Sequence, residues 1–277
     1  MATPFISRLE PSSLEGFKRG KPHNEQPSTV PKTFLDAMEV RESVFVKEQQ
    51  ILPENEFDAD DARSCHWVVY ASVNKMEEAE VCDDDGNIIQ PRRSSTRTTP
   101  IGTIRVVPFP HEPHPKPGAE YWNGKLSSTG NKDSASSTAA TSSTAATISK
   151  GRNRATIFHD GREPYLKLGR LAVAKEYRGN GLSTLLVQTA ISWLKSNPSF
   201  FDPSITELGL KQVGASTEAD IPKWGGLVCV HAQQHVVKAW EKWGFVVDRE
   251  MGSWWEEGIP HVGMFRRLEF TPEKLRI

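Results

Sequence analysis

The stretch Leu171-Ala-Val-Ala-Lys-Glu-Tyr-Arg-Gly-Asn-Gly-Leu-Ser-Thr-Leu-Leu186 decides the fold of this chain. It begins as an apolar strand, passes through a basic, glycine-rich turn and then starts an amphipathic helix. After the turn, large apolar residues recur with the i, i+3, i+4 spacing of one helical face: Leu182, Leu185, Leu186, Ala190, Trp193 and Leu194. The sequence therefore predicts a strand, a tight turn and a helix in direct succession.

The turn Arg178-Gly-Asn-Gly181 lies where the predicted helix begins. Gly179 and Gly181 let the backbone turn sharply and approach a ligand closely, because glycine has no Cβ. The first N–H groups of a helix have no partner within it, and the positive end of the helix dipole lies beside them. Together with the cation of Arg178, these features predict a seat for a phosphate or pyrophosphate group.

Two common phosphate-binding patterns do not fit this turn. The pattern G-x-x-x-x-G-K-[ST] is absent, because no Lys-Ser/Thr pair follows the second glycine. The dinucleotide pattern G-x-G-x-x-G fails because Thr184 stands where the third glycine is required. What remains is R-x-x-G-x-[small], in Arg178, Gly181 and Ser183. These residues resemble the coenzyme A loop of the GNAT superfamily of N-acyltransferases, which usually has Gly or Ala in place of Ser183.

Further blocks, in the expected order, extend the resemblance over most of the chain and are similar to the ElaA-like subgroup in particular. Val40-Arg-Glu-Ser-Val-Phe-Val-Lys-Glu-Gln49 and the acidic run Glu56-x-Asp58-x-x-Asp61-x-x-x-x-His66 precede the turn. Val-His-Ala-Gln233, Lys-Ala-Trp-Glu-Lys-Trp-Gly-Phe245 and Glu-Glu-Gly-Ile-Pro-His-Val-Gly-Met264 follow it. The resemblance implies one GNAT-like N-acetyltransferase domain over residues 1–277.

The fold class predicted from the order of elements is α/β (α+β), with a sheet flanked by helices. The resemblance implies a mixed, mostly antiparallel sheet of about six or seven strands. Strands are predicted over residues 5–9, 66–73, 100–108, 164–174, 227–232, 245–248 and 261–268. Helices are predicted over 31–49, with Thr33 as the cap, after Gly181 and over 234–243. The resemblance also implies that strands 164–174 and 227–232 splay apart, with the thioester arm between them.

Three inserts interrupt the predicted domain, at about 74–99, 109–160 and 197–224. Residues 125–151 hold almost no large apolar side chain, so burial cannot offset the entropy of ordering them and we expect disorder. Residues 74–99 are expected to form a long mobile hairpin loop. For residues 197–224 a surface excursion is favoured over a lid on the substrate site.

Composition argues against several classes of protein. With 34 basic and 35 acidic residues the net charge is −1, which offers no basic face for nucleic acid. The three cysteines, Cys65, Cys82 and Cys229, suggest neither a disulfide framework nor a zinc site, and no metal is expected. No membrane span or signal peptide is evident. We expect a soluble cytoplasmic protein, with a nuclear location and a homodimer left open.

The chemistry of acyl transfer requires a bound acetyl-CoA, a polarised thioester carbonyl and an unprotonated amine. The resemblance implies that the backbone of Leu171, Ala172 and Val173 polarises the carbonyl. It implies that the coenzyme is held by Arg178, Gly179, Asn180, Gly181, Leu182, Ser183 and Thr184. Candidate general bases or substrate contacts are Glu56, His66, His231 and His261. Candidate substrate-binding residues are Arg41, Gln49, Asp58, Asp61 and Trp240. Each of these candidates also has a purely structural alternative, because histidines in strands often pack in the core and acidic loops are often only solvated.

The chain departs from the family in its last helix, where many GNAT enzymes have a Phe-Tyr pair whose hydroxyl protonates the leaving thiolate. Here the pair is Ala239-Trp240, and an indole N–H is too weak an acid for that step. Core packing is therefore the favoured role of Trp240.

Three hypotheses follow from the sequence. The first is an acetyl-CoA-dependent N-acetyltransferase acting on a small-molecule primary amine, such as an amino sugar, a polyamine or an amino-acid-like compound. The second is a protein or peptide N-acetyltransferase, which needs an open groove. The third is a non-catalytic, coenzyme A-binding regulatory protein. The first is preferred, because the acidic run around Asp58 suggests a compact cationic acceptor.

Overall fold

The computed structural model describes residues 4–83, 88–127, 153–202 and 223–270, which fall into two compact units. Unit 1 comprises Met1–Arg105 and Arg170–Val187, and unit 2 comprises Val106–Gly169 and Gln188–Ile277. Strands β5 (Arg93–Val107) and β8 (Leu166–Val173) and helix α3 (Leu182–Ser196) each contribute residues to both units. The single domain expected for the whole chain stays a prediction.

Unit 1 is built on strands in the order β1-β2-β5-β8. β1 (Phe5–Leu9) pairs antiparallel with β2 (Cys65–Glu78), and Leu9 lies opposite His66. Helix α1 (Lys32–Arg41) places Ala37 against Val68 and Tyr70 of β2. The remaining helical segments are η1 (His23–Glu25), η2 (Glu42–Glu48), α2 (Pro53–Glu56) and η3 (Lys175–Tyr177).

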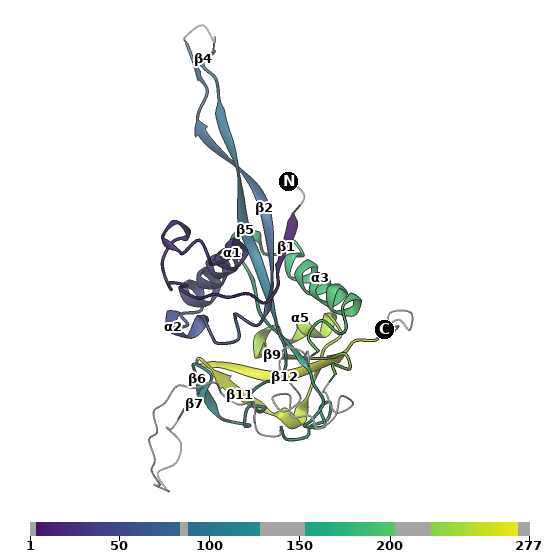
Figure 1. Ribbon diagram of the computed structural model, residues 1–277. Coiled ribbons are helices and arrows are strands. Elements are labelled where there is room, and N and C mark those ends of the chain that lie inside the picture. Colours follow the sequence, from purple (N-terminus) through teal and green to yellow (C-terminus); the bar gives the residue numbers. More distant parts are fainter. Residues whose placement is uncertain (1–3, 84–87, 128–152, 203–222, 271–277) are drawn as a thin grey trace. The chain divides into compact units, whose positions relative to one another are not determined.

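The insert at 74–99, predicted as a long mobile hairpin loop, is a hairpin whose two arms are largely strands. β2 and β5 continue together past β1, and β3 (Val81–Cys82) and β4 (Ile88–Gln90) lie near the far end (Figure 1). The strands predicted at 66–73 and 100–108 are therefore shorter than β2 and β5, the strands that the structure has there. The difference has a physical reason, because the ladder needs only backbone partners, and the Thr-rich run 96–99 is compatible with an exposed strand.

Unit 2 is built on strands in the order β8-β9-β12-β11-β6-β7, with β10 paired to β12. Neighbouring strands of unit 2 pair antiparallel, except β8 with β9 and β11 with β6, which are parallel. The strands are β6 (Glu120–Trp122), β7 (Lys125–Leu126), β9 (Leu227–Gln233), β10 (Val246–Val247), β11 (Ser253–Glu256) and β12 (Ile259–Arg267). The helical segments besides α3 are η5 (Gln234–Val236), α5 (Val237–Lys242) and η6 (Arg249–Met251).

The fold class is confirmed as a mixed, mostly antiparallel α+β architecture with helices beside the strands. The predicted strands are found, but β6, β7 and β11 were not predicted. β6 and β7 are only three and two residues long, and β11 is a four-residue strand between Gly252 and Gly258. Such short elements carry too little periodicity to be recognised.

Local predictions for the helices are partly wrong. The helix expected over 31–49 changes at Glu42 into a π-helical turn, and Thr33 makes no cap, because Pro31 occupies the N-cap position. In α3, Leu185 is exposed rather than on the buried face. Leu186, Ala190 and Leu194 of the predicted face are fully buried, and so is Val187, which was not predicted to be on that face.

The remaining inserts lie mostly outside the described residues. Of the stretch expected to be disordered, 125–151, only Lys125–Ser127 are described, and Lys125 and Leu126 form β7. Most of the insert at 197–224 is likewise outside the described part. None of the helices in the described ranges has the length and apolar character that crossing a bilayer requires.

Candidate functional site

The predicted strand–turn–helix is present in unit 1, where β8 leads through η3 into α3. Gly179 and Gly181 both have left-handed backbone conformations, with φ of 80° and 74°. A Cβ added at either glycine would meet no atom within 4 Å. Open space therefore lies beside both glycines, as close approach of a ligand to this turn requires.

Successive N–H groups of this turn lack backbone acceptors. Among the described residues, none accepts from the N–H of Gly179, Asn180, Gly181, Leu182 or Ser183. The side-chain amide of Asn180 donates to the carbonyls of Tyr177 and Arg178, at 3.0 and 3.3 Å, and braces the turn. The unmatched N–H groups at the start of a fifteen-residue helix form a seat for an anion.

The cation of this turn, Arg178, already has an anionic partner. Its two terminal nitrogens donate to the two carboxylate oxygens of Glu48 at 2.7 Å, and its Nε donates to the carbonyl of Val173 at 3.0 Å. This hydrogen bond from Arg178 lowers the pKa of Glu48 and raises that of Arg178. Glu48, at the end of η2, is a functional candidate that the sequence analysis missed.

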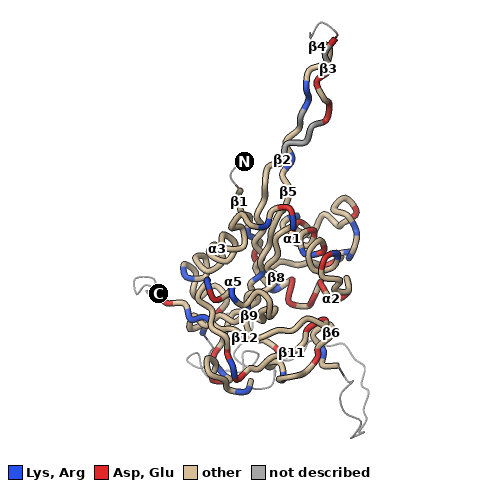
Figure 2. Tube along the Cα trace, turned by 180° about the vertical axis from the view of Figure 1, so that it is seen from behind, with Lys and Arg blue, Asp and Glu red and all other residues tan. Residues whose placement is uncertain are grey.

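The acidic run at 56–66 is part of an ion cluster in unit 1. Acidic residues gather at α2 and in the loop that follows it (Figure 2). Arg41 contacts Glu56 and Asp61, at 2.6 Å each. Arg105 contacts Asp58 and Asp61, at 2.7 Å each. The whole ion cluster comprises Arg41, Glu56, Asp58, Asp61, Arg105 and Arg170.

Three carboxylates and three guanidinium groups balance in this ion cluster. Burial would raise the pKa of Asp58, but Arg105 and Arg170 lower it to about 2. Burial would likewise raise the pKa of Asp61, which Arg41 and Arg105 hold well below its usual range. Carboxylates held in this way are poor proton acceptors. The carboxylates of the acidic run 56–66 therefore pair with arginines inside unit 1. Their negative charge no longer supports the hypothesis of a cationic acceptor.

The ion cluster also holds the backbone of β8. Arg170 has φ of 51°, in the left-handed region that non-glycine residues rarely adopt. Its side chain lies 3.0 Å from Asp58 and 3.1 Å from Glu56. Leu171, Ala172 and Val173, the residues expected to polarise the carbonyl, come directly after it, so the ion pairs fix the strand where that segment begins.

Of the other candidates in unit 1, His66 is a buried internal residue. Its Nε2 lies 2.9 Å from the carbonyl oxygen of Asp61, and its ring packs edge-on against Phe34. Burial lowers the pKa of His66 to about 4. Gln49 is half-buried and ends η2. His66 is therefore placed for packing rather than for contact with a substrate.

In unit 2, alternate residues of three strands bring titratable side chains to one face. Gly263 of β12 lies opposite His231 of β9, and Trp254 of β11 lies opposite His261 of β12. His231 Nδ1 lies 2.9 Å from Glu256 Oε1, which also accepts from Trp254 Nε1 at 2.7 Å. We call this group the His231–Glu256–Trp254 cluster.

Electrostatics in this cluster favour a neutral imidazole. Burial, followed by the ammonium of Lys167, lowers the pKa of His231 to about 4, although Glu256 opposes this shift. Burial would raise the pKa of Glu256, but His231 and His261 lower it well below its usual range. At neutral pH the cluster thus pairs a carboxylate with an unprotonated imidazole. Lys167, Glu256 and Trp254 were not among the predicted site residues.

The last two candidates in unit 2 differ in their surroundings. His261 is buried, and its Nδ1 lies 2.8 Å from the carbonyl of Ile259. Trp240 is 6% exposed and packs edge-on against Trp243 and Phe245. Trp240 therefore occupies a packing position, the role that its sequence context favoured over substrate binding.

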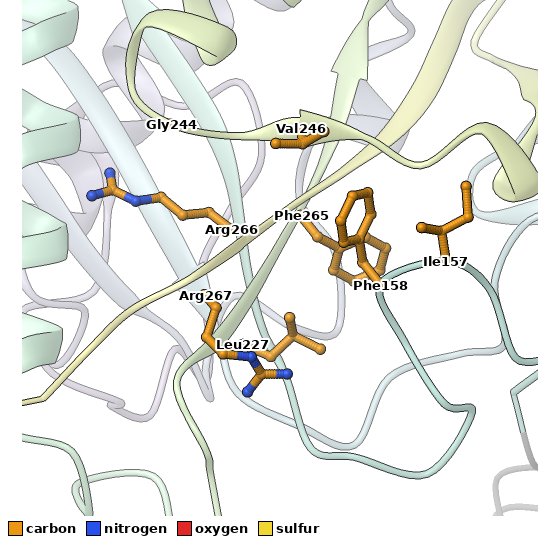
Figure 3. Close-up of a pocket in the computed structure, with 8 residues that line it drawn as sticks. All are labelled: Ile157, Phe158, Leu227, Gly244, Val246, Phe265, Arg266 and Arg267. Carbon is orange, nitrogen blue, oxygen red and sulfur yellow. The ribbon is translucent and has the colours of Figure 1, made fainter.

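Unit 2 also has a pocket of about 430 Å³, which is lined by other residues than these candidates. Phe158 and Phe265 line one part of it, and Arg266 and Arg267 extend away from the aromatic rings (Figure 3). Both arginines are engaged, Arg266 with the carbonyl of Trp243 and Arg267 with the carboxylate of Glu163. None of the predicted site residues lines this pocket.

Comparison with known families matches the segment that holds the turn. The model of the acetyltransferase (GNAT) family matches residues 146–201, which include β8, the turn and α3. Over these residues the chain is similar to a family of enzymes for which acetyl-CoA is the typical co-substrate. A search of curated proteins gives no match.

Several solved structures are similar to the chain at low identity. A candidate N-acetyltransferase of Lactobacillus plantarum is 16% identical, with a TM-score of 0.45, covering 96% of this chain and 99% of that one. An acyl-CoA N-acyltransferase of Pseudomonas aeruginosa is 15% identical, with a TM-score of 0.43, covering 95% and 99%. ElaA of Escherichia coli is 14% identical, with a TM-score of 0.43, covering 96% and 100%.

Proposed function

We propose that this protein is an N-acetyltransferase that moves the acetyl group of acetyl-CoA to a primary amine of a small molecule. The observation that carries the proposal is the turn at 178–183, within the segment that matches the acetyltransferase (GNAT) family. Its unmatched N–H groups supply the donors, and its two left-handed glycines supply the space, that a pyrophosphate needs.

The reaction proposed here is direct attack of the amine on the thioester. The acceptor reacts as its unprotonated amine, and His231, whose imidazole is neutral at physiological pH, accepts a proton from the amine nitrogen as that nitrogen attacks. The nitrogen bonds to the carbonyl carbon and gives one proton to His231, and the tetrahedral oxyanion collapses with cleavage of the carbon–sulfur bond to give the amide and the thiolate. The leaving thiolate needs no acid to depart, because a thiol pKa is only about 8.5.

The charges beside His231 support one class of acceptor over others. The side-chain ammonium of Lys167 makes no hydrogen bond or ion pair with any described residue, yet its charge acts on both His231 and Glu256. An acceptor with a carboxylate and an amine can use both the ammonium and the imidazole. We therefore place amino-acid-like amines ahead of amino sugars and polyamines.

The first test is release of free thiol from acetyl-CoA by the full-length protein. The panel contains amino acids and their analogues, amino sugars, polyamines and lysine peptides, and mass spectrometry identifies each acetylated product. We expect turnover with a carboxylate-bearing amine. Turnover confined to lysine peptides contradicts the small-molecule assignment, and coenzyme binding without turnover on any amine favours a regulatory protein.

The second test asks whether the turn holds the coenzyme. Gly181→Asp places a carboxylate where the pyrophosphate is proposed to lie, so calorimetry with coenzyme A should detect no binding. Gly20→Asp is the matched control, because Gly20 also has a left-handed φ, of 67°, and open space at its Cβ position. Equal affinities of the two variants would contradict the assignment of the turn.

A further inference from the structure

We infer that Glu256 is a positioning residue that holds the His231 imidazole with Nε2 as the proton acceptor of the transfer reaction. This inference rests on the proposed function and adds to it a residue in β11 that carries no predicted role. It assigns three separate tasks, with His231 accepting the proton, Glu256 orienting the ring and Trp254 fixing the carboxylate.

The geometry determines which imidazole nitrogen is available. An ionised carboxylate can only accept hydrogen bonds, so the contact between Glu256 Oε1 and His231 Nδ1 requires a hydrogen on Nδ1. In the neutral ring, Nε2 then carries the lone pair. No described residue makes a hydrogen bond with Nε2, so this nitrogen is available to accept a proton.

The ring and the carboxylate are both held by buried structure. Trp254 is fully buried, donates to the same Oε1 atom at 2.7 Å and packs edge-on against the His231 ring with centroids 4.8 Å apart. The side chain of His231 is 11% exposed and that of Glu256 is 33% exposed. Buried structure thus holds the cluster rigidly on one side, while its other side is partly open. A general base that acts on a substrate requires both features.

The register of the sheet brings these residues together. His231 lies opposite Gly263 in β12, and a Cβ at Gly263 would lie 2.1 Å from Met251 Sδ. Glycine at this position therefore lets Met251 enter the core between η6 and β12. Any larger residue at position 263, opposite His231, would have to displace Met251 or β12.

Several charged or titratable groups besides Glu256 act on His231. Lys167 of β8 and His261 of β12 both lower its pKa, while Glu256 raises it. His114, which precedes β6, is close enough for His231 to lower its pKa in turn. Glu256 is thus the one group in this set that makes His231 a stronger base. Its removal should weaken proton acceptance without protonating the ring.

The test replaces Glu256 by glutamine, which keeps the shape and removes the charge. We expect Glu256→Gln to lower kcat by about 10- to 100-fold, part of the 10²–10⁴-fold effect of a positioned base. The KM for acetyl-CoA should stay unchanged. Glu257→Gln is the matched control, because Glu257 is the adjacent residue and accepts a hydrogen bond from the Asn123 N–H instead. An unchanged kcat in Glu256→Gln overturns the inference.

A double-variant cycle distinguishes positioning from a general loss of structure. If Glu256 acts only through His231, adding Glu256→Gln to His231→Ala should cause no further loss of kcat. A further loss equal to that of the single Glu256→Gln variant shows independent action and overturns the inference.

Nitrogen NMR of the imidazole gives a readout that does not need turnover. The wild-type protein should show hydrogen on Nδ1 and none on Nε2 of His231, and Glu256→Gln should show a mixture, because the new amide can either accept or donate. A wild-type ring with hydrogen on Nε2 overturns the inference. If the wild-type protein turns over no amine, the proposed function fails, while the NMR result still decides how His231 is held.

Discussion

Two charged clusters, one in each unit, differ in how completely their groups are matched. In the ion cluster of unit 1, guanidinium and carboxylate groups are equal in number, and four of the six side chains are at most 6% exposed. In the His231–Glu256–Trp254 cluster, one imidazole nitrogen has no described partner. Arg105 Nε and Arg170 Nε also lack hydrogen-bond acceptors, so the difference lies in the bases: each carboxylate of the ion cluster faces a guanidinium group, whereas the imidazole of His231 keeps an open lone pair. Matched groups stabilise, and the unmatched nitrogen can react.

The largest expected effect is on stability, from Arg41→Leu. This change leaves Glu56 and Asp61 buried with one cation fewer, so the free energy of unfolding should fall by about 3–5 kcal/mol. Urea denaturation measures the change. The matched control is Arg63→Leu, which removes an exposed pair with Asp60 and should cost at most about 1 kcal/mol. Similar losses of unfolding free energy in the two variants would contradict a stabilising role of the buried ion cluster.

The next effect compares a histidine from each cluster. His231→Ala should lower kcat by about 100-fold or more, because the proton acceptor is removed. The thermal midpoint of unfolding should change little by comparison with this loss of rate. His66→Gln should leave the kcat of the folded protein within about twofold, since its ring contacts only internal groups. Steady-state rates and thermal scans on both variants decide this. A larger loss of kcat in His66→Gln than in His231→Ala reverses the assignment.

Stability should fall in mild acid because histidines are buried in the neutral form. The pKa of His66 is lowered from 6.5 to about 4, so the unfolded chain binds more protons between these values. The free energy of unfolding therefore rises with pH through this window and falls on acidification. His66→Gln should remove about 2 kcal/mol of the loss between pH 7 and pH 5. Denaturation curves at the two pH values test this, and an unchanged pH dependence would contradict the burial of a neutral ring.

The same contrast explains what the sequence predicts well and what it does not. The turn at 178–183 is a local feature, since two glycines and the following apolar spacing specify it without distant partners. The ion cluster is not local, because Arg41 meets carboxylates 15 and 20 residues away and Arg105 meets Asp61 across 44 residues. The acidic spacing was visible in the sequence, but its cationic partners were not.

The role of Glu256 was hidden for a related reason. Its strand, β11, was not predicted, and its contact with His231 crosses 25 residues through the register of β11, β12 and β9. The signal available was the short Trp-Trp-Glu run between glycines, followed by a strand with Gly263. The side chains that share one face of the sheet can be identified only when the strand register is known, because a shift of one residue exchanges the two faces.

The smallest expected effect concerns the exposed ion pair between Glu48 and Arg178, beside the proposed coenzyme seat. Glu48 holds both terminal nitrogens of Arg178, so it places a negative charge where a pyrophosphate would also use that cation. Glu48→Gln should tighten coenzyme A binding by about two- to fivefold at low salt, and the gain should shrink as salt screens the charges. Calorimetry measures it, with Glu10→Gln as the control, because that change removes an exposed Glu–Arg pair at the end of β1. Weaker binding in Glu48→Gln would mean that Glu48 orients Arg178 for the coenzyme instead of competing with it. The turn would then resemble the His231–Glu256–Trp254 cluster, in which a carboxylate positions the group that acts.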